Sequence, residues 1–482
     1  MARGMLEVEL VGADDDAPAA VAPRRLPRRW LVGGAVLAAA ALGLTQWIGL
    51  TRERAELARL AEVPGVLAPV DPTLVVARRV APQDLGELYE SGSWSLDVGD
   101  DGAQTLAWDG WTTQLAGPDD ALADSAGQVM GGSTCRPDSE PDADLSTATR
   151  VVCLVTDGGM IFDGAGGVAT VPATTRRVVV LSAADGSEIA QWPVDRGATL
   201  ELFAGAVVLG SATAQDITVS AYGLLTGEQR WTHVDPWPDG LEYSAQDQLG
   251  VSVFRAGDLL AYSPPGRSLV LLSADGTVVR HLDEVGTGGW GWNNDPSSGR
   301  LVMQSQDATG SSVTRFIAAD GDPGSDVTVD GWPLEMSVDD GSVPGLLLTS
   351  DGTVRAWDAG TGAPRWSHDV AIVSSVVVLR GRVYLATSRD VLALDGRTGR
   401  LLWTAARQTG LLPRSLLTDG RHILVGFDTA SSAGPPPLVA YDPASGREDF
   451  RAPYPDGITD LTSIRGRLVG HDLATDEYLV LE

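Results

Sequence analysis

The sequence predicts an all-β fold, a β-propeller of eight four-stranded blades preceded by one transmembrane α-helix. Two observations predict the propeller: short apolar runs alternate with turn residues from about residue 74 onward, and one sequence unit recurs along that stretch. A third observation, an uncharged apolar run near the N-terminus, predicts the helix. The 57 Gly and 28 Pro among 482 residues disfavour a coiled coil.

The apolar run covers residues 30–50, which are 21 residues without a formal charge. At ~1.5 Å per residue this run spans about 30 Å, the thickness of a hydrocarbon core. Four arginines lie between residues 24 and 29, and this positive flank is predicted to stay in the cytoplasm. A signal peptide cleaved near residues 38–40 is the alternative, but it would leave only about eight apolar residues before the cleavage site. We therefore predict a retained anchor in the cytoplasmic membrane.

The predicted organisation follows from this anchor. Residues 1–29 form a cytoplasmic basic and disordered tail, 30–50 the transmembrane helix, 51–73 a stalk and 74–482 the propeller outside the cytoplasm. The stalk is expected to be helical as far as Val63, before Pro64. The formal net charge of −29 repels phosphate backbones, so we expect no nucleic-acid partner.

The recurring unit contains an apolar strand, an Asp, a turn ending in Gly, and a second strand with an aromatic residue four positions past the Gly. The clearest copies are Asp358, Gly362 and Trp366; Asp395, Gly399 and Trp403; Gly227 and Trp231 without the Asp; and Asp442, Gly446 and Phe450. Weaker copies turn at Gly186, Gly276 and Gly321. The mean separation of the seven glycines is about 43 residues, the length of one four-stranded blade.

Each residue type in the unit suits a propeller blade. Glycine adopts a positive φ without steric penalty, and the neighbouring Asp and Thr side chains accept or donate hydrogen bonds within the turn. The aromatic residue has the area to pack between neighbouring sheets. Because one sheet cannot bury both of its faces alone, the units must stack, and a closed ring protects their edges.

The number of blades follows from closure of the ring. Seven turn glycines indicate seven hairpins, and three more strands are predicted at residues 458–464, 467–471 and 478–481. The missing outer strand of that last blade is predicted from residues 74–80, which gives eight blades and joins the two ends of the chain. Residues 92–116 are expected to form an extra hairpin or a degenerate blade, so seven and nine blades stay open.

The repeat resembles the tryptophan-docking repeat of the PQQ-like (quinoprotein alcohol dehydrogenase-like) β-propellers. The resemblance covers roughly residues 74–482, with sharp matches in three or four blades. It implies a fold shared with quinone-dependent dehydrogenases, with the BamB-type assembly propeller at a distance, and with membrane-anchored extracytoplasmic propellers of GC-rich Gram-positive bacteria. The last group has the same layout: a short basic tail, one span and an outer propeller.

The two cysteines bear on the enzymatic members of that family. Quinone catalysis there uses a pair of adjacent cysteines, whereas Cys135 and Cys153 are 18 residues apart. We therefore predict no quinone cofactor. Residues 129–135 and 150–155 are both predicted as strands, and antiparallel pairing would bring the sulfurs together as a structural disulfide. Two free buried thiols are the alternative.

Other candidate sites are weak. The five histidines show no zinc-binding spacing, and we predict no metal. Residues 320–326 resemble a calcium loop in their carboxylate content but lack its final Glu, and are interpreted as a solvated turn. Four aromatic residues lie off the repeat positions: Trp237, Trp290, Trp292 and Trp332. They are interpreted as wedged between blades, with ligand stacking as the alternative.

No set of catalytic, cofactor-binding or metal-binding residues emerges from the sequence. The predicted function is that of a non-catalytic, membrane-tethered extracytoplasmic scaffold that binds a protein, a peptide or a cell-wall polymer. The alternative is a quinone- or sugar-dependent oxidoreductase with its site in the central channel. That alternative requires several blades to direct titratable groups towards the channel.

Overall fold

The computed structural model describes residues 51–482 apart from 82–87, 89–93, 100, 109, 119–127, 140–146, 163–167, 172, 195–198, 239–250, 264–267, 283–289, 295–299, 307–309, 406–409 and 430–434. The chain divides into two compact units, Met1–Arg59 and Leu60–Glu482. Residues 51–60 are helical. The predicted transmembrane helix, residues 30–50, lies outside the described residues. Among the helices that are described, none has both the length and the apolar character needed to cross a membrane.

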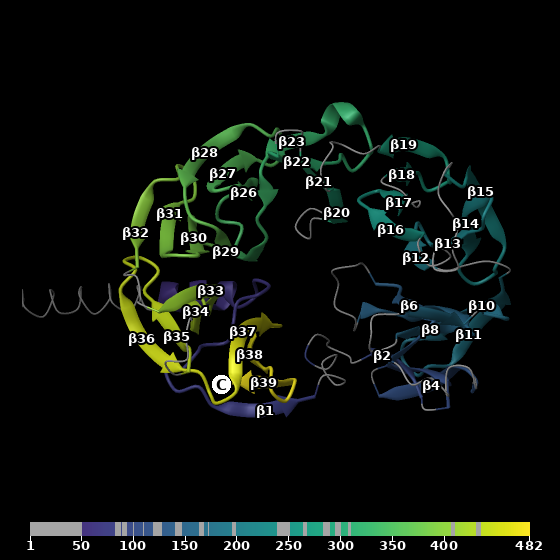
Figure 1. Cartoon of the computed structure of the whole chain (residues 1–482), viewed down its shortest axis with the longest axis horizontal. Helices are drawn as coiled ribbons and strands as arrows, with labels where there is room; N and C mark the ends of the chain where they lie inside the picture. The colour runs from purple at the N-terminus through teal and green to yellow at the C-terminus, as the bar shows by residue number, and fades with distance from the viewer. Residues whose placement is uncertain are drawn as a thin grey trace, which may run out of the picture. The chain divides into compact units, whose positions relative to one another are not determined.

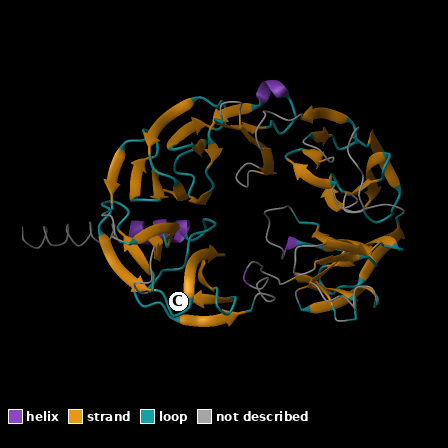
Figure 2. Ribbon diagram, in the orientation of Figure 1, coloured by secondary structure: helices purple, strands orange, loops and turns teal. Residues whose placement is uncertain are grey.

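The second unit is built of antiparallel strands, and the predicted all-β class is confirmed for its described part (Figures 1 and 2). Among the described residues, eight sheets have four or five strands, and we number them 1 to 8 in chain order. Sheets 1 to 4 contain β6 (Thr134–Pro137), β7 (Arg150–Thr156), β10 (Arg176–Ser182) and β11 (Glu188–Pro193); β12 (Thr199–Phe203), β13 (Ala206–Ala212), β14 (Asp216–Gly223) and β15 (Gln229–Pro236); β16 (Ser252–Ala256), β17 (Leu259–Ser263), β18 (Leu269–Leu272) and β19 (Val278–Leu282); and β20 (Trp290–Asn294), β21 (Leu301–Gln306), β22 (Ser312–Phe316) and β23 (Val327–Asp330).

Sheets 5 to 8 complete the series. They contain β24 (Trp332–Pro333), β26 (Leu346–Ser350), β27 (Thr353–Asp358) and β28 (Pro364–Asp369); β25 (Met336–Asp339), β29 (Val373–Leu379), β30 (Arg382–Thr387), β31 (Val391–Asp395) and β32 (Leu401–Thr404); β33 (Leu411–Thr418), β34 (Ile423–Thr429), β35 (Pro437–Tyr441) and β36 (Glu448–Pro453); and β37 (Ile458–Ile464), β38 (Arg467–Asp472), β39 (Glu477–Leu481) and β1 (Val76–Val80). In sheet 6, β25 adds to the edge of β29 in parallel.

Two smaller sheets precede or interrupt this series. Strands β2 (Trp94–Val98), β3 (Gln104–Trp108) and β4 (Trp111–Ala116) form a three-stranded sheet, at the place where an extra hairpin or degenerate blade was predicted. Strands β5 (Gln128–Gly131), β8 (Gly159–Phe162) and β9 (Val168–Val171) form another. This second sheet is built from the connections before β6 and between β7 and β10.

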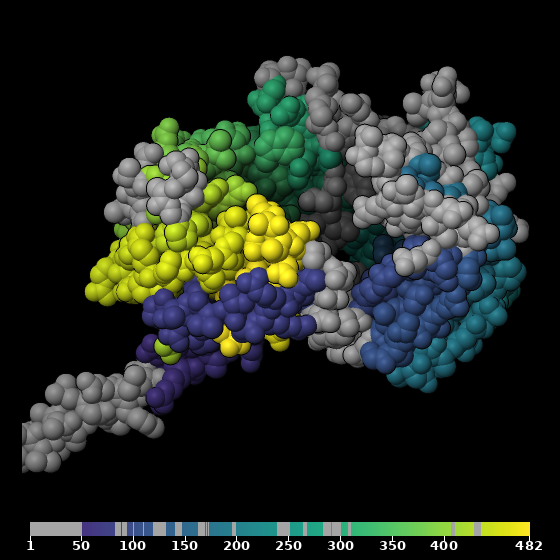
Figure 3. Space-filling view, turned by 60° about the horizontal axis from the view of Figure 1, so that its bottom comes forward, coloured from purple at the N-terminus to yellow at the C-terminus, as the bar shows by residue number. Residues whose placement is uncertain are grey.

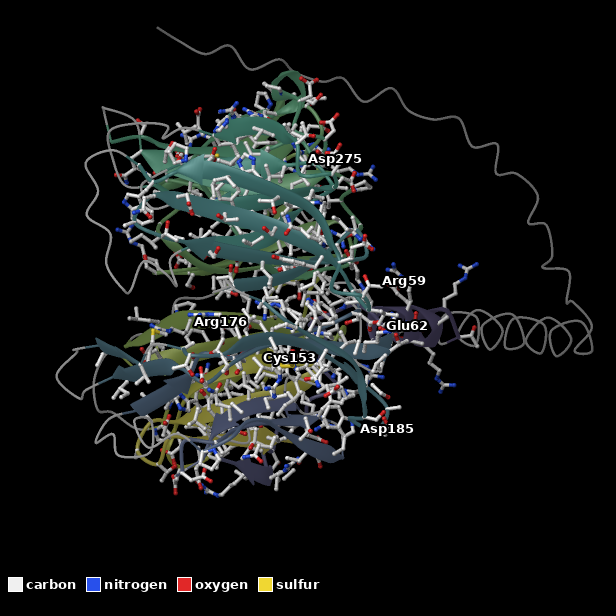
Figure 4. The ribbon with its side chains drawn as sticks, turned by 90° about the vertical axis from the view of Figure 1, so that its right-hand side faces the viewer. Arg59, Glu62, Cys153, Arg176, Asp185 and Asp275 are labelled. Atoms are coloured by element: carbon white, nitrogen blue, oxygen red, sulfur yellow. A yellow bond between two sulfur atoms is a disulfide. The ribbon has the colours of Figure 1, made fainter. Side chains whose placement is uncertain are left out.

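Within the second unit the numbered sheets follow one another in chain order, and the last strand of each, such as β15, β28, β32 or β36, lies outermost (Figure 1). The strands of sheet 6 are counted from β29, to whose edge β25 is added. Because neighbouring strands alternate in direction, the turn between strands three and four lies at the same end as the turn between strands one and two. We call this the docking-turn end. Asp185 lies in the turn between β10 and β11, and Asp275 lies in the turn between β18 and β19. Both are found at this end (Figure 4).

The N-terminal strand β1 pairs with the C-terminal strand β39. The register runs from Val76 opposite Leu481 to Val80 opposite Tyr478, and Figure 3 shows the two ends of this unit in contact. Two backbone hydrogen bonds between Val75 and Glu482, of 2.9 and 3.0 Å, extend the pairing. The prediction that residues 74–80 supply the missing strand of the last sheet is confirmed.

Residues 60–70, predicted to be stalk, instead pack within the second unit. Leu60 is fully buried with Val66 in one apolar cluster of sheets 6 and 7. The backbone N–H of Leu67 donates to the Thr418 carbonyl at 2.8 Å, and that of Ala68 to the Gly466 carbonyl at 2.8 Å. The apolar residues of the predicted helical stalk thus make tertiary contacts. The sequence pattern alone does not distinguish an exposed stalk from a segment that packs on the sheets.

Candidate functional site

The repeated glycines form the contact between consecutive sheets. All seven predicted turn glycines have a positive φ, from 65° at Gly227 to 82° at Gly276. A Cβ added at Gly446 would lie 2.5 Å from the Trp403 ring of the preceding sheet, and one at Gly399 would lie 2.7 Å from Trp366. At five of the seven turns an indole of the preceding sheet covers the glycine in this way, whereas Gly321 and Gly362 are covered by aliphatic side chains.

The indole N–H completes this docking. Trp403 donates to the Pro443 carbonyl at 3.0 Å, and Trp366 and Trp231 donate at 2.9 Å to carbonyls of the turns that they cover. Trp111 of β4 docks in the same way on the turn of sheet 1, at 3.0 Å from the Ala183 carbonyl. Trp192 also covers the turn of the next sheet, but its buried N–H has no hydrogen-bond partner among the residues that the structure describes. These tryptophans are structural.

The repeated aspartates hold the turns. Asp395 Oδ1 accepts from the backbone N–H and the hydroxyl of Thr398, at 2.9 and 2.8 Å, and Asp442 binds Ser445 in the same way. The hydrogen bond from the Thr398 side chain lowers the pKa of Asp395. Asp358 binds Thr361 and also Arg365, whose guanidinium lies 2.7 Å from Oδ2. The carboxylates are thus occupied within their own turns.

The contact between sheets 3 and 4 departs from this pattern. Strand pairing places Leu271 opposite Arg280, as it places Ala356 opposite Trp366 and Ala393 opposite Trp403. Arg280 therefore occupies the docking position of sheet 3. Its guanidinium crosses to sheet 4 and binds Asp326, with Nη1–Oδ1 and Nη2–Oδ2 distances of 3.1 and 2.8 Å.

A second arginine binds the same carboxylate. Arg315 Nε and Nη2 lie 2.8 and 2.6 Å from Asp326 Oδ2, and the Ala318 N–H donates to Oδ1 at 3.0 Å. The side chain of Asp326 is only 4% exposed. Burial raises the pKa of Asp326, but the hydrogen bonds from Arg280 and Ala318 and the charges of both arginines outweigh it, so the net effect is a lowered pKa. We call these three side chains the Arg–Asp–Arg cluster.

This geometry corrects the interpretation of residues 320–326 as a solvated turn. Asp322 does cap a short 3-10 helix, η4 (Pro323–Ser325), from an exposed position. Asp326, however, is buried and bound by arginines. In the described part of the chain, no three His, Cys, Asp or Glu side chains are grouped in a way that would hold a metal ion.

A cleft of about 230 Å³ opens beside the cluster. It is lined by Met303, Ser305, Val313, Arg315, Pro323, Asp326 and Thr328. All seven belong to sheet 4 and its turn, and Met303 lies directly opposite Arg315 in the strand register. Ser305 is 6% exposed, and within the described residues its hydroxyl has no hydrogen-bond partner. We call this the sheet 4 cleft, and sequence reasoning missed it.

Charged side chains also lie on three consecutive inner strands. Glu201 of β12 is flanked by Arg136 of β6 and Arg255 of β16. Burial raises the pKa of Glu201, and the two arginines offset only part of that effect. Three adjacent sheets therefore carry titratable groups on their innermost strands, which is the arrangement that the enzymatic alternative required.

The histidines are bound by neighbouring acids in several sheets. His233 Nε2 lies 3.2 Å from both the Tyr262 hydroxyl and the Asp235 carboxylate, and Tyr262 donates to the same carboxylate. His422 lies 3.1 Å from Asp419.

The remaining sequence candidates lie at several places in the fold. Trp237 is buried between sheets 2 and 3, and Trp332 is half-buried in β24. Trp290 and Trp292 belong to β20, but their side chains lie outside the described residues. Cys135 and Cys153 are directly opposed on β6 and β7 and joined by a disulfide with an S–S distance of 2.08 Å.

The chain was then compared with known proteins. Residues 274–472 match the family described as "Outer membrane protein assembly factor BamB". A comparison with curated protein sequences finds no match. The predicted resemblance to PQQ-like propellers, with BamB as a distant relative, is therefore confirmed over residues 274–472.

Solved structures align over most of the chain with low similarity. BamB from Moraxella catarrhalis is 13% identical, with 85% of this chain and 100% of that chain covered and a TM-score of 0.32. The C-terminal WD40 domain of Sif2 is 12% identical, with 86% and 99% covered and a TM-score of 0.34. A europium-containing methanol dehydrogenase is 11% identical, with 86% and 91% covered and a TM-score of 0.34. These similarities are too low to support an inference about the function of this chain.

Proposed function

We propose that the chain is a membrane-tethered, extracytoplasmic β-propeller of eight blades that acts as a non-catalytic scaffold for protein partners. The observation that carries this proposal is the match of residues 274–472 to the family of an outer membrane protein assembly factor. The matched stretch contains five of the seven turn glycines, and its repeat residues are occupied by docking and turn hydrogen bonds. These repeat residues hold the fold together, so we expect a partner to bind at other parts of the surface.

The eight-blade proposal takes each of sheets 1 to 8 as one blade. It is supported by the four-stranded core that these sheets share and by the β1–β39 pairing that joins the chain ends. The sheet of β2 to β4 then acts as an extra element, which docks Trp111 on the first blade.

The proposed location rests on the arginine-flanked apolar run at residues 30–50. Single cysteines at Glu228, which is exposed on sheet 2, and at Ala17 in the tail test it. In intact bacterial cells, a membrane-impermeant maleimide should label Glu228→Cys, and should label Ala17→Cys only after permeabilisation. The parent chain is the control, because its two cysteines form a disulfide. Labelling with the reverse pattern would contradict the proposed topology.

A protein partner is tested by site-specific photo-crosslinking in cells. Ile372 and Leu473 are 77% and 67% exposed at the end opposite the docking turns, and Arg447 is exposed beside the docking turn of Gly446. We expect a crosslinker at one end, but not at the other, to give adducts of discrete mass. Absence of discrete adducts from all three positions would contradict a protein scaffold.

The enzymatic alternative makes a different prediction. A quinone-dependent oxidoreductase should bind PQQ in the presence of calcium saturably, with a spectral change of the quinone. We expect no such binding by the purified full-length chain. Saturable binding that is lost in Glu201→Gln would instead assign the inner-strand charges to a cofactor site and overturn the scaffold proposal.

A further inference from the structure

We propose that the sheet 4 cleft binds a free carboxylate attached to a small apolar group, and that its occupant is the C-terminal residue of a peptide or protein. The inference deepens the proposed scaffold function, on which it rests, by naming the chemistry of one partner. Three observations carry it: the guanidinium nitrogen of Arg315 that is free within the described part of the chain, the Ser305 hydroxyl that lines the cleft, and apolar walls of matching size.

The charge comes from the Arg–Asp–Arg cluster. Two guanidinium groups share one carboxylate, so the cluster has a net charge of +1 inside a chain of net charge −29. Asp326 already accepts from both arginines and from Ala318. The nearest acids of the turn, Asp320 and Asp322, are exposed and accept backbone N–H groups of the turn itself. Both carboxylates stay charged, but solvent screens them more than it screens the buried cluster, so the attraction of an anion to the cleft comes from Arg315.

Arg315 presents this charge to the cleft. Its Nε and Nη2 atoms bind Asp326, and no bond within the described part of the chain involves Nη1. The guanidinium is planar and donates two parallel hydrogen bonds to a carboxylate more readily than a lysine would. Its side chain is 28% exposed, so a ligand can reach it.

The Ser305 hydroxyl supplies the second polar contact. Ser305 lines the cleft and is 6% exposed, yet its hydroxyl lacks a hydrogen-bond partner among the described residues. Its oxygen is not enclosed by protein atoms, so it is open to the solvent of the cleft, where a ligand oxygen can replace water as its partner. A ligand oxygen in the cleft would satisfy this hydroxyl while it binds Arg315.

The apolar walls and the volume of the cleft determine which group can be attached to the carboxylate. Met303, Val313 and Pro323 supply apolar surface. The volume of about 230 Å³ is below the roughly 300–1,000 Å³ of sites for drug-sized molecules. The cleft thus fits one residue with an apolar side chain, and the carboxylate of such a residue is free only at a C-terminus.

The test compares two probes on the purified full-length chain in mild detergent: N-acetyl-Ala-Leu with a free carboxylate, and the same dipeptide with a C-terminal amide. We expect saturable binding of the acid in the millimolar range or tighter by calorimetry, weakened by added salt. The amide should bind at least about 10-fold more weakly, because it loses a charge-assisted hydrogen bond.

Variants locate the site. Arg315→Met should weaken binding of the acid by about 10- to 100-fold and Ser305→Ala by a smaller factor. Arg315→Met keeps the neutral Arg280–Asp326 pair, and a thermal melt checks the fold. Arg355→Met is the matched control, since Arg355 pairs with Asp351 on sheet 5 and is 29% exposed, and it should leave binding unchanged.

The outcomes separate the two proposals. No saturable binding of the acid, equal binding of acid and amide, or undiminished binding by a folded Arg315→Met variant would overturn the cleft proposal. If the acid binds at the cleft while the crosslinkers find no protein, the scaffold proposal fails and the cleft assignment stands. If crosslinks form but the acid does not bind, only the cleft assignment fails.

Discussion

Two contacts between neighbouring sheets use the same backbone frame with opposite chemistry. Between sheets 6 and 7, Trp403 fills the space over Gly446, packs against Tyr384 at a centroid distance of 5.9 Å and donates its indole N–H to the Pro443 carbonyl. Between sheets 3 and 4, Arg280 holds the equivalent position and binds Asp326, while Val279 and Leu259 cover Gly321. A docking position therefore sets where two sheets meet, while the residue type decides whether the contact there is apolar or charged.

The largest loss of stability should come from removing the indole that fills the contact between sheets 6 and 7. Trp403→Ala removes a side chain that is 8% exposed and should lower the free energy of unfolding by about 3–5 kcal/mol. Chemical denaturation followed by the remaining tryptophans measures it. Leu401→Ala on the same strand, where Leu401 is 45% exposed, is the control and should cost far less. Equal losses would show that the indole does not secure the contact.

Asp326→Asn comes next, because it leaves two arginines without their carboxylate. We expect a loss of about 3 kcal/mol at neutral pH. The lowered pKa of Asp326 fixes the pH dependence: the stabilisation is present above the usual aspartate pKa of 3.8 and is lost as pH falls through the lower folded pKa. Melts of both proteins from pH 7 downward should converge at the acid end.

The double variant Arg280→Trp with Asp326→Ala sharpens the same comparison. It places an indole at the docking position of sheet 3 and removes the buried charge pair. Since apolar packing often matches a buried ion pair, stability should return to within about 1 kcal/mol of the parent chain. A double variant no more stable than Asp326→Asn would show that sheet 4 cannot receive an indole.

Two glycines with the same backbone conformation separate strain from contact. Gly446 and Gly362 both have a φ of 69°. An added Cβ would lie 2.5 Å from the Trp403 ring at Gly446, but 3.1 Å from a Val327 methyl at Gly362. Alanine at either position should cost about 1 kcal/mol in backbone strain, and Gly446→Ala should cost about 1–3 kcal/mol more from overpacking. If denaturation gives the same loss of stability at both positions, backbone strain alone explains it and contact with the Trp403 ring adds nothing.

The smallest effect concerns the inner strands. The pKa of Glu201 is raised above 4.5, so its ionised form destabilises the fold at neutral pH, and this penalty disappears as pH falls below the unfolded pKa. Glu201→Gln should therefore raise the melting temperature slightly at pH 7 and leave it unchanged near pH 4. A lower melting temperature at pH 7 would mean that the two arginines depend on this charge.

The sequence predicted the parts of this fold that repeat. Each turn glycine and its Asp are local features, and the aromatic residue four positions later marked the docking position. The Arg–Asp–Arg cluster was missed because Arg280 and Asp326 look like ordinary surface residues until strand pairing places Arg280 where other sheets have tryptophan. The cleft lies on sheet 4 and depends on which side chains strand pairing brings to one face of it, as it does for Met303 and Arg315, and no local pattern encodes that. The packing of residues 60–70 was missed for a similar reason, since its partners Thr418 and Gly466 are distant in the chain.

The pairing of β1 with β39 has a consequence for biosynthesis. Arg79 of β1 and Glu477 of β39 are 398 residues apart, so β1 has no pairing partner until the ribosome has made β39. Contacts between residues so far apart in the sequence form slowly, and an unpaired strand edge can form hydrogen bonds with other chains and so promote aggregation. The edge of β1 must therefore be protected until β39 has been made, and a chain truncated before Glu477 would leave that edge unpaired.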